Sequence, residues 1–321
     1  MSTWQSQLSD GFRSASELLA FLQLPAAGMS AAAQADFATR VPRHFAALMT
    51  PGDLDDPLLR QVLPIGDETL QVPGFSDDPL AEQQNAAPGV LHKYGSRALL
   101  ILRGGCAVNC RYCFRRAFPY AELSWSARTQ RDALGYLRAD AGINEVILSG
   151  GDPLMASDEA IADLVGELAG IDHITRVRVH SRLPVVMPDR LTPQLHQALT
   201  GTRLKPVLML HANHPREISR ALHERLQPFV RDLPVFNQAV LLRGVNDDAS
   251  TLAALSEALF NSRIQPYYLF LLDRVRGAAH FEVPEAEAKV VYRDLQSRLP
   301  GFLVPRLARE IPDKPNKTLV L

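Results

Sequence analysis

Short apolar runs alternate with amphipathic segments along most of the chain from residue 98 onward. The apolar runs have the length and composition of buried strands, and the segments between them have a helical period. The apolar runs cover residues 98–102, 145–149, 176–180, 206–210, 234–240 and 266–272. The helix-like segments cover residues 126–139, 157–169, 191–199, 215–227 and 249–260. Because strands that return through helices pair in parallel, the pattern predicts an α/β fold, a partial (β/α) barrel of about six units.

The two ends of the chain follow other patterns. The first part is rich in Ala, Pro and Asp, and Ser14-Ala-Ser-Glu17 before apolar residues has the pattern of a capping box, so helices are predicted there. The tail from Pro305 carries several Pro and Lys residues without a helical period. We therefore expect an N-terminal helical extension at 1–90, a core barrel at 91–295 and a C-terminal segment at 296–321.

Composition and charge narrow the class of partner. The 321 residues are 46% hydrophobic, enough for a sizeable core, and 34 basic against 35 acidic side chains give a formal net charge of −1. This balance gives no general attraction to nucleic acid or to an anionic membrane, so a small-molecule substrate is expected. No apolar run approaches the roughly 20 residues of a membrane span. The first residues also lack the apolar stretch of a secretory signal, and a cytoplasmic location is expected.

The three cysteines, Cys106, Cys110 and Cys113, form a CxxxCxxC pattern just after the first predicted strand. This clustering is wrong for a disulfide framework and typical of metal binding in a reducing compartment. Active sites of β/α barrels gather at that end of the strands. Three thiolates can hold three irons of a [4Fe–4S] cluster and leave the fourth iron open. The alternatives are a structural zinc site of three Cys and one His, or three unrelated core cysteines.

An open iron can chelate the amino and carboxylate groups of S-adenosylmethionine (SAM). One electron from the cluster can then break the carbon–sulfur bond of SAM and give a 5′-deoxyadenosyl radical. The segment Gly150-Gly151-Asp152-Pro153 closes the second predicted strand, and its two glycines let the backbone approach a ligand closely. The order of the two motifs therefore predicts a SAM site beside the cluster.

These motifs resemble those of the radical SAM superfamily and, within it, of the lysine 2,3-aminomutase family. The resemblance is carried by CAVNCRYCFRR (106–116), SGGDPL (149–154), HSRLPVVMPDRLT (180–192), HANHPREIS (211–219) and NQAVLLRGVND (237–247). It implies a partial (β/α)6 radical SAM barrel with an N-terminal helical extension and a C-terminal cofactor-binding segment. The family has long and short forms. This chain, with RVPRHFAALM near its start and PRLARE near its end, resembles the short bacterial form that makes β-lysine for the modification of elongation factor P.

The resemblance implies a second cofactor, pyridoxal 5′-phosphate (PLP), held as a Schiff base by a lysine near the C-terminus. The match through PRLARE assigns this role to Lys317, and Lys314 is the other candidate. Taken alone, either lysine would be assigned to the solvated surface. The cofactor phosphate is expected to bind Lys93 and Arg97. Lys93 stands where the family has arginine, so it keeps the charge without the bidentate fork.

The resemblance also implies substrate contacts. Arg115 matches the residue that binds the substrate carboxylate, whereas its neighbour Arg116 can be merely structural. Asp273 and Glu310 match two acidic positions that bind the distal ammonium of lysine, with Glu310 one methylene longer than the family's Asp. Paired carboxylates suit a cationic group in a partly dry site, so lysine is the expected substrate.

Residues at the C-terminal ends of successive predicted strands are expected to bind SAM. They are Gly150, Gly151, Asp152, His211 and Gln238. His214 lies close enough to exchange roles with His211.

The expected enzyme is an isomerase that converts L-α-lysine to β-lysine, needs an external reductant, and is linked in function to elongation factor P and its lysine ligase. Two other functions are compatible with the same cysteine pattern. One is a radical SAM 2,3-aminomutase for another amino acid or for protein-bound lysine, and the other is a non-catalytic iron–sulfur redox protein. A zinc-stabilised binding module is a third class.

Overall fold

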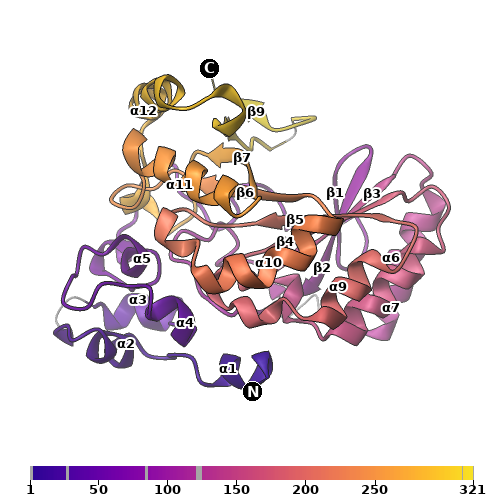
Figure 1. The fold of residues 1–321 in the computed structure, drawn as a ribbon, viewed down its shortest axis with the longest axis horizontal. Helices are drawn as coiled ribbons and strands as arrows, with labels where there is room; N and C mark the ends of the chain where they lie inside the picture. The colour runs from indigo at the N-terminus through magenta and orange to yellow at the C-terminus, as the bar shows by residue number, and fades with distance from the viewer. Residues whose placement is uncertain (1–2, 27–28, 84–85, 121–124, 313, 321) are drawn as a thin grey trace.

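The centre of the fold is a sheet whose strands follow one another in chain order (Figure 1). The computed structural model describes residues 3–26, 29–83, 86–120, 125–312 and 314–320. In these residues the strands are β1 (Val90–Tyr94), β2 (Arg97–Arg103), β3 (Glu145–Gly150), β4 (Arg176–Ser181), β5 (Lys205–Leu210), β6 (Val235–Val240), β7 (Gln265–Phe270), β8 (Arg306–Arg309) and β9 (Thr318–Leu319). Strands β2 to β8 pair in parallel, and β1 and β9 pair antiparallel at the two edges.

The six predicted strands are present as β2 to β7, with bounds within a few residues of those expected, so the α/β barrel prediction is confirmed. The tail, whose sequence has no helical period, contains two short strands. Its residues form β8, which extends the parallel sheet beside β7, and β9, which turns back against β8. The division of the chain into three parts stays a prediction, and β8 and β9 of the expected C-terminal segment belong to the same sheet as the barrel.

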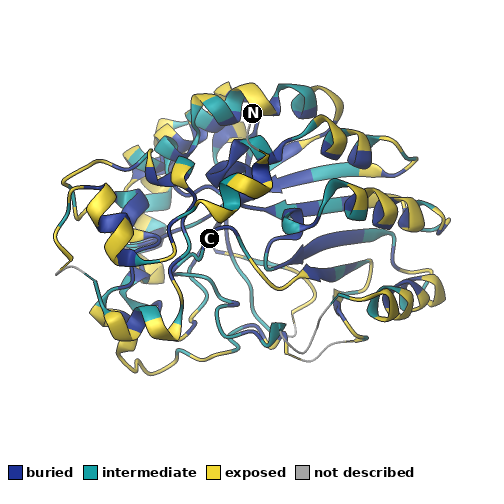
Figure 2. Ribbon diagram, turned by 90° about the horizontal axis from the view of Figure 1, so that it is seen from below, coloured by how far each residue is buried: buried dark blue, intermediate teal, exposed yellow. Residues whose placement is uncertain are grey.

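Helices cover the outer face of the sheet, and the exposed sides of these helices face solvent (Figure 2). Those that follow the strands are α6 (Ala127–Ala139), α7 (Asp158–Ala169), α8 (Leu183–Val186), α9 (Pro193–Thr200), α10 (Arg220–Asp232), α11 (Ala249–Asn261) and α12 (Glu285–Arg298). Short 3₁₀ turns are η2 (Gly66–Thr69), η4 (Pro153–Met155), η5 (Pro188–Arg190), η6 (Pro215–Glu217), η7 (Ala279–Phe281) and η8 (Gly301–Leu303). None of the described helices is long and apolar enough to cross a membrane.

Strand alternation divides the barrel into a core and a cavity. In β4, Val177 and Val179 are fully buried in the main hydrophobic cluster against the helices. Arg178 and His180, which point to the opposite face, line the cavity. Side chains of a strand alternate between two faces, so the same segment that builds the core also presents polar groups to the interior.

The N-terminal part is helical, as predicted, with α1 (Trp4–Ser9), α2 (Ala15–Phe21), α3 (Ala31–Asp36), α4 (Arg43–Ala46) and α5 (Pro57–Arg60). Ser14 caps α2, but its hydroxyl accepts the N–H of Ser16 at 3.2 Å instead of closing the predicted box with Glu17. Leu18, Leu19 and other apolar residues of these helices belong to the same hydrophobic cluster as the barrel strands. The extension is therefore packed onto the barrel instead of standing apart from it.

Candidate active site

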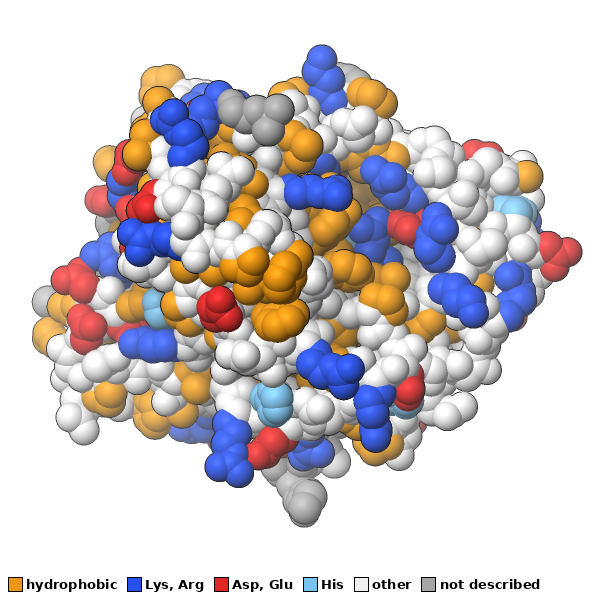
Figure 3. Space-filling view, turned by 45° about the horizontal axis from the view of Figure 1, so that its top comes forward, with side chains coloured by type: hydrophobic (Ala, Val, Ile, Leu, Met, Phe, Trp, Pro, Cys, Tyr) orange, Lys and Arg blue, Asp and Glu red, His pale blue; other side chains and the backbone are white. Residues whose placement is uncertain are grey.

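Every residue that the sequence assigned to a cofactor, the cluster or the substrate lines one cavity of about 1120 Å³. The cavity lies inside the barrel, and Figure 3 shows a hollow with Lys and Arg side chains around it. His214 and Lys314, the two alternative candidates, are absent from the residues lining the cavity. His214 instead accepts the N–H of Arg216 through Nδ1 at 3.3 Å, which caps η6.

The N-terminal extension holds the loop that carries the cysteines. Arg40 donates from its guanidinium to the carbonyl of Cys106 at 2.9 Å, and its own carbonyl accepts the N–H of Asn109 at 3.0 Å. The Asn109 side chain donates to the carbonyl of Ala38 at 2.8 Å. These contacts fix the backbone between the cysteines, a feature that the cysteine spacing does not reveal.

A buried ion-pair network anchors the same loop. Arg111 is fully buried and pairs with Glu68, while it also donates to the carbonyls of Phe37 and Ala33. Arg116 pairs with Glu68 at 3.0 Å. The expectation that Arg116 can be structural thus agrees with its position, because its guanidinium joins this network. Removing Glu68 would leave the buried Arg111 without its carboxylate partner and Arg116 with only its 3.4 Å contact to Asp36, which is strongly destabilising.

The three thiols line the cavity, and burial changes the acidity of two of them. Burial, followed by Asp152 and the other thiols, raises the pKa of Cys106, and burial with Cys110 raises that of Cys113 to about 11. Iron binding therefore has to displace protons from these groups. Within the described parts of the chain, no group of three or more His, Cys, Asp or Glu side chains is placed to hold a single metal ion. Thiols that each bind a different iron have no need to converge on one point.

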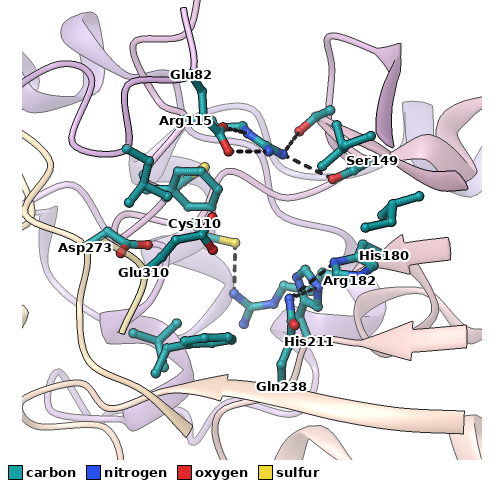
Figure 4. A pocket seen from close by; sticks show the side chains of 18 of the residues that line it. Glu82, Cys110, Arg115, Ser149, His180, Arg182, His211, Gln238, Asp273 and Glu310 are labelled. Carbon is teal, nitrogen blue, oxygen red and sulfur yellow. Dashed lines mark hydrogen bonds and ion pairs between the residues drawn. The ribbon is translucent and has the colours of Figure 1, made fainter. Parts of the chain in front are cut away.

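Arg115 faces the cavity, but most of its donors are already in use (Figure 4). Its Nε and Nη2 donate to the Glu82 carboxylate at 2.6 and 3.1 Å. Its Nη1 donates to the Ser149 hydroxyl at 3.1 Å and to the Gly150 carbonyl at 3.2 Å. A guanidinium has five N–H groups, so a substrate carboxylate finds few free donors unless these contacts rearrange.

Glu82 is a buried carboxylate of the cavity that the sequence reasoning missed. It pairs with Arg115 and, at 3.0 Å, with Lys93. Burial alone would raise its pKa, but Arg115 and Lys93 outweigh burial and hold the pKa below its ordinary value. Glu82 is therefore ionised and joins the two cations that were assigned to the substrate carboxylate and to the PLP phosphate.

Lys317 and Glu310, which both belong to the C-terminal segment of the chain, line the cavity and lie in direct contact. Lys317 Nζ is 2.6 Å from Glu310 Oε2, and Glu310 also accepts from the Tyr94 hydroxyl at 3.2 Å and lies 3.4 Å from Lys93. Asp273 lines the same region, where burial and the charge of Glu310 raise its pKa to about 7. The two predicted ammonium ligands thus differ: Glu310 is paired with Lys317, whereas Asp273 has a raised pKa and binds its proton more tightly than an ordinary carboxyl group.

Arg97 is the freer of the two predicted phosphate ligands. Its guanidinium lies over the Tyr94 ring at 4.1 Å from the centroid, and no ion pair joins it to a carboxylate within the described residues. Lys93, by contrast, pairs with Glu82 and Glu310. A phosphate would therefore meet an unpaired cation at Arg97.

His211 and Gln238 lie side by side with His180 (Figure 4). Gln238 Nε2 is 2.9 Å from His211 Nε2 and 3.5 Å from His180 Nδ1. Burial, Arg182 and Arg115 lower the pKa of His211 to about 3, so its ring is neutral. The buried Nε2 of His180 has no hydrogen-bond partner in the described structure, which leaves one polar atom of this group free for a ligand. The sequence reasoning did not single out His180.

Asp152 is held by protein groups. Its carboxylate accepts the Ser181 hydroxyl at 2.8 Å and the N–H groups of Leu154, Arg182 and Leu183 at 2.9–3.0 Å. Despite these bonds, burial raises its pKa. These contacts join the end of β3 to the end of β4, so the predicted SAM ligand has a clear structural task.

The glycines before Asp152 are required by a close approach of two backbones. Gly150 has a φ of +117°, and a Cβ there would lie 2.7 Å from the carbonyl oxygen of Arg103. A Cβ on Gly151 would lie 2.6 Å from the carbonyl oxygen of Gly105. The motif therefore lets β3 lie against the start of the cysteine loop, in addition to any approach of a ligand.

The comparisons with known proteins agree with this arrangement. The Radical SAM superfamily model matches residues 100–253. The chain is 49% identical to the L-lysine 2,3-aminomutase of Escherichia coli over 98% of this chain and 93% of the relative. It is 47% identical to that of Haemophilus influenzae over 98% and 95%, and 42% identical to that of Buchnera aphidicola over 99% and 95%. The chain therefore belongs to the L-lysine 2,3-aminomutase family of radical SAM enzymes.

Proposed function

We propose that this protein converts L-α-lysine to β-lysine. The amino group moves from C2 to C3 and a hydrogen atom moves from C3 to C2. The observation that carries the proposal is one cavity that is lined both by the three cysteines and by Lys317, Asp273 and Glu310. Two carboxyl groups beside a lysine, in the same cavity as the cysteines, suit a substrate with a distal ammonium group. The family membership supports the same reaction.

In this proposal Cys106, Cys110 and Cys113 hold a [4Fe–4S] cluster, Lys317 holds PLP, and Arg97 with Lys93 receives its phosphate. When bound, the cluster and SAM supply a hydrogen-abstracting radical, and PLP carries the amino group that migrates. Lys317 has to leave Glu310 to bond to PLP, since the two are paired in the described structure.

The ends of the substrate are recognised by charge. Arg115 binds the α-carboxylate as its contacts to Glu82 rearrange, while Asp273 and Glu310 bind the distal ammonium. Asp273 loses its proton as the ammonium arrives, because a nearby cation favours the ionised carboxyl. Two carboxylates at this end disfavour an acidic amino acid, whose side chain would meet like charge.

SAM is proposed to bind along Gly150, Gly151, His211 and Gln238, next to the cysteines. The neutral His211 ring and the Gln238 amide suit an uncharged part of SAM such as the adenine edge or the ribose. Asp152 contributes mainly by fixing the backbone at the ends of β3 and β4, since its oxygens already accept several protein donors.

We further propose that the product is released as the free amino acid and used by a separate ligase to modify elongation factor P. The support is the resemblance of the short form to the bacterial type with that role. The three unpaired cysteines agree with a reducing compartment, and we place the enzyme in the cytoplasm. Mass spectrometry of elongation factor P from cells that lack this protein should show loss of the β-lysyl modification.

The test of the reaction uses anaerobically reconstituted protein with dithionite, SAM, PLP and L-lysine. Derivatised amino acids are separated by chromatography, and β-lysine is expected. The product should disappear in Cys110→Ala and in Lys317→Ala, and the latter should keep its iron. Formation of 5′-deoxyadenosine without β-lysine would mean that the substrate is another amino acid or a protein-bound lysine. Absence of both in protein with a full cluster would favour a redox protein.

A further inference from the structure

Arg182 directly contacts the sulfur of one predicted cluster ligand. The residue follows β4, and its Nη1 lies 2.8 Å from Cys110 Sγ, as Figure 4 shows. The same nitrogen contacts the Tyr112 hydroxyl. Arg182 lines the cavity and is 5% exposed, so its charge is little screened by solvent.

Other contacts prevent the guanidinium from turning away. Its Nη2 donates to Gln61 at 2.7 Å and to Glu217 at 3.0 Å, and Glu217 is completely buried. The backbone N–H of Arg182 donates to Asp152 at 2.9 Å. Contacts with four segments of the chain thus fix the direction in which the Nη1 group of Arg182 points.

We infer that Arg182 is a positioning residue that raises the reduction potential of the cluster through Cys110. The inference rests on the proposed role of Cys110 as a cluster ligand. On reduction the cluster gains one electron from the external reductant, and Arg182 stays protonated throughout. A fixed positive N–H donor at a ligand sulfur stabilises the more negative, reduced state. The oxidised state gains less from the same contact, so reduction becomes easier.

Arg190 offers a matched control from the same segment of the chain. Like Arg182 it is almost fully buried, and it pairs with Asp158. Its guanidinium donates to Asp158 and to the carbonyls of Leu154 and Ala156, and it does not line the cavity. Substitution at Arg190 should therefore cost stability without an effect on the cluster potential.

The experiment is a redox titration of the anaerobically purified holoprotein, followed by electron paramagnetic resonance of the reduced cluster, without SAM. Iron and sulfide are measured first in each protein. At the potential that half reduces the wild-type cluster, Arg182→Gln should lower the ratio of reduced to oxidised cluster about tenfold, a shift of about 59 mV. Arg182→Lys keeps the charge but loses the fork, and should lower the ratio about threefold. Arg190→Lys should match the wild type.

The outcomes separate the inference from the proposed function. Wild-type protein without iron and sulfide would refute the cluster assignment itself. Wild-type and Arg182→Lys proteins with full clusters and equal potentials would overturn the inference, and this variant decides the matter if Arg182→Gln does not assemble a cluster. An equal shift in Arg190→Lys would also overturn it, because the effect would then follow from a general loss of packing.

Discussion

Replacing Asp273 by Asn should stabilise the substrate-free, PLP-free protein at neutral and alkaline pH. Burial and the charge of Glu310 raise the pKa of Asp273 from 3.8 to about 7 in the folded protein. Between these two values the unfolded chain releases a proton that the folded protein keeps. The stability of the wild type therefore falls as pH rises through this window and stays reduced above it. Asn has a similar size and carries no charge, so it escapes this cost.

The size of the effect follows from the shift. A change of about 3 pKa units, at about 1.36 kcal/mol each, gives roughly 4 kcal/mol as an upper limit. The carboxyl faces a cavity that admits water, which screens part of the cost. We expect the Asn variant to gain about 1–3 kcal/mol at pH 8, less than half of that at pH 5, and nothing near pH 4.

Thermal unfolding of the two proteins between pH 5 and pH 8 measures this difference, because carboxyl groups that are remote from Asp273 titrate alike in both. Glu310→Gln is the control, because its effect on stability is expected to have the opposite sign. Although burial raises the pKa of Glu310, Lys317 and Lys93 lower it further, so the ionised carboxyl stabilises the fold and its loss should lower the Tm at pH 8. A variant Asp273→Asn that is no more stable than wild type at pH 8, or whose gain is independent of pH, would refute the reasoning.

Three further substitutions test the site. Arg97→Ala should weaken PLP binding about tenfold or more in a spectrophotometric titration while the iron content stays unchanged, because a charge-assisted contact to phosphate is lost. Arg115→Lys should raise the KM for lysine about tenfold, since an ammonium cannot replace a bidentate fork; an unchanged KM would argue against a contact with the carboxylate. Asp152→Asn should lower stability by about 1–3 kcal/mol in thermal unfolding. Loss of SAM binding at full stability would instead identify Asp152 as a ligand.

Most of the parallel strands could be predicted because they are short apolar runs, as strands covered by helices tend to be, whereas β4 alternates Val177 and Val179 with polar residues. β8 escaped this reasoning because its four residues include two arginines, and its place depends on pairing of Arg306 with Tyr268 of β7. The helix expected from residue 215 begins only at Arg220, after Ser219 as its cap, because residues 215–217 form a 3₁₀ turn. Local patterns thus predicted the kind of element well, and long-range pairing decided the rest.

The chemistry of the site divides in the same way. Cysteine spacing alone pointed to the cluster, and the family resemblance pointed to Lys317 and the substrate ligands, because these residues belong to recognisable segments. The buried carboxylates had no such signal. Glu68, Glu82 and Glu217 come from loops and turns that lie 43, 33 and 35 residues from the arginines they pair with.

A buried arginine requires a counter-charge, so Arg111, Arg115 and Arg182 each predict that some carboxylate lies beside them. The sequence offers 35 acidic residues for this purpose, and no periodicity selects among them. The selection is made by the fold, which brings loops from the N-terminal extension and from the end of β5 to the mouth of the barrel. The carboxylates that pair with the buried arginines are therefore the part of this cavity that is hardest to predict from sequence. They nevertheless decide how many donors of each arginine remain free for a ligand.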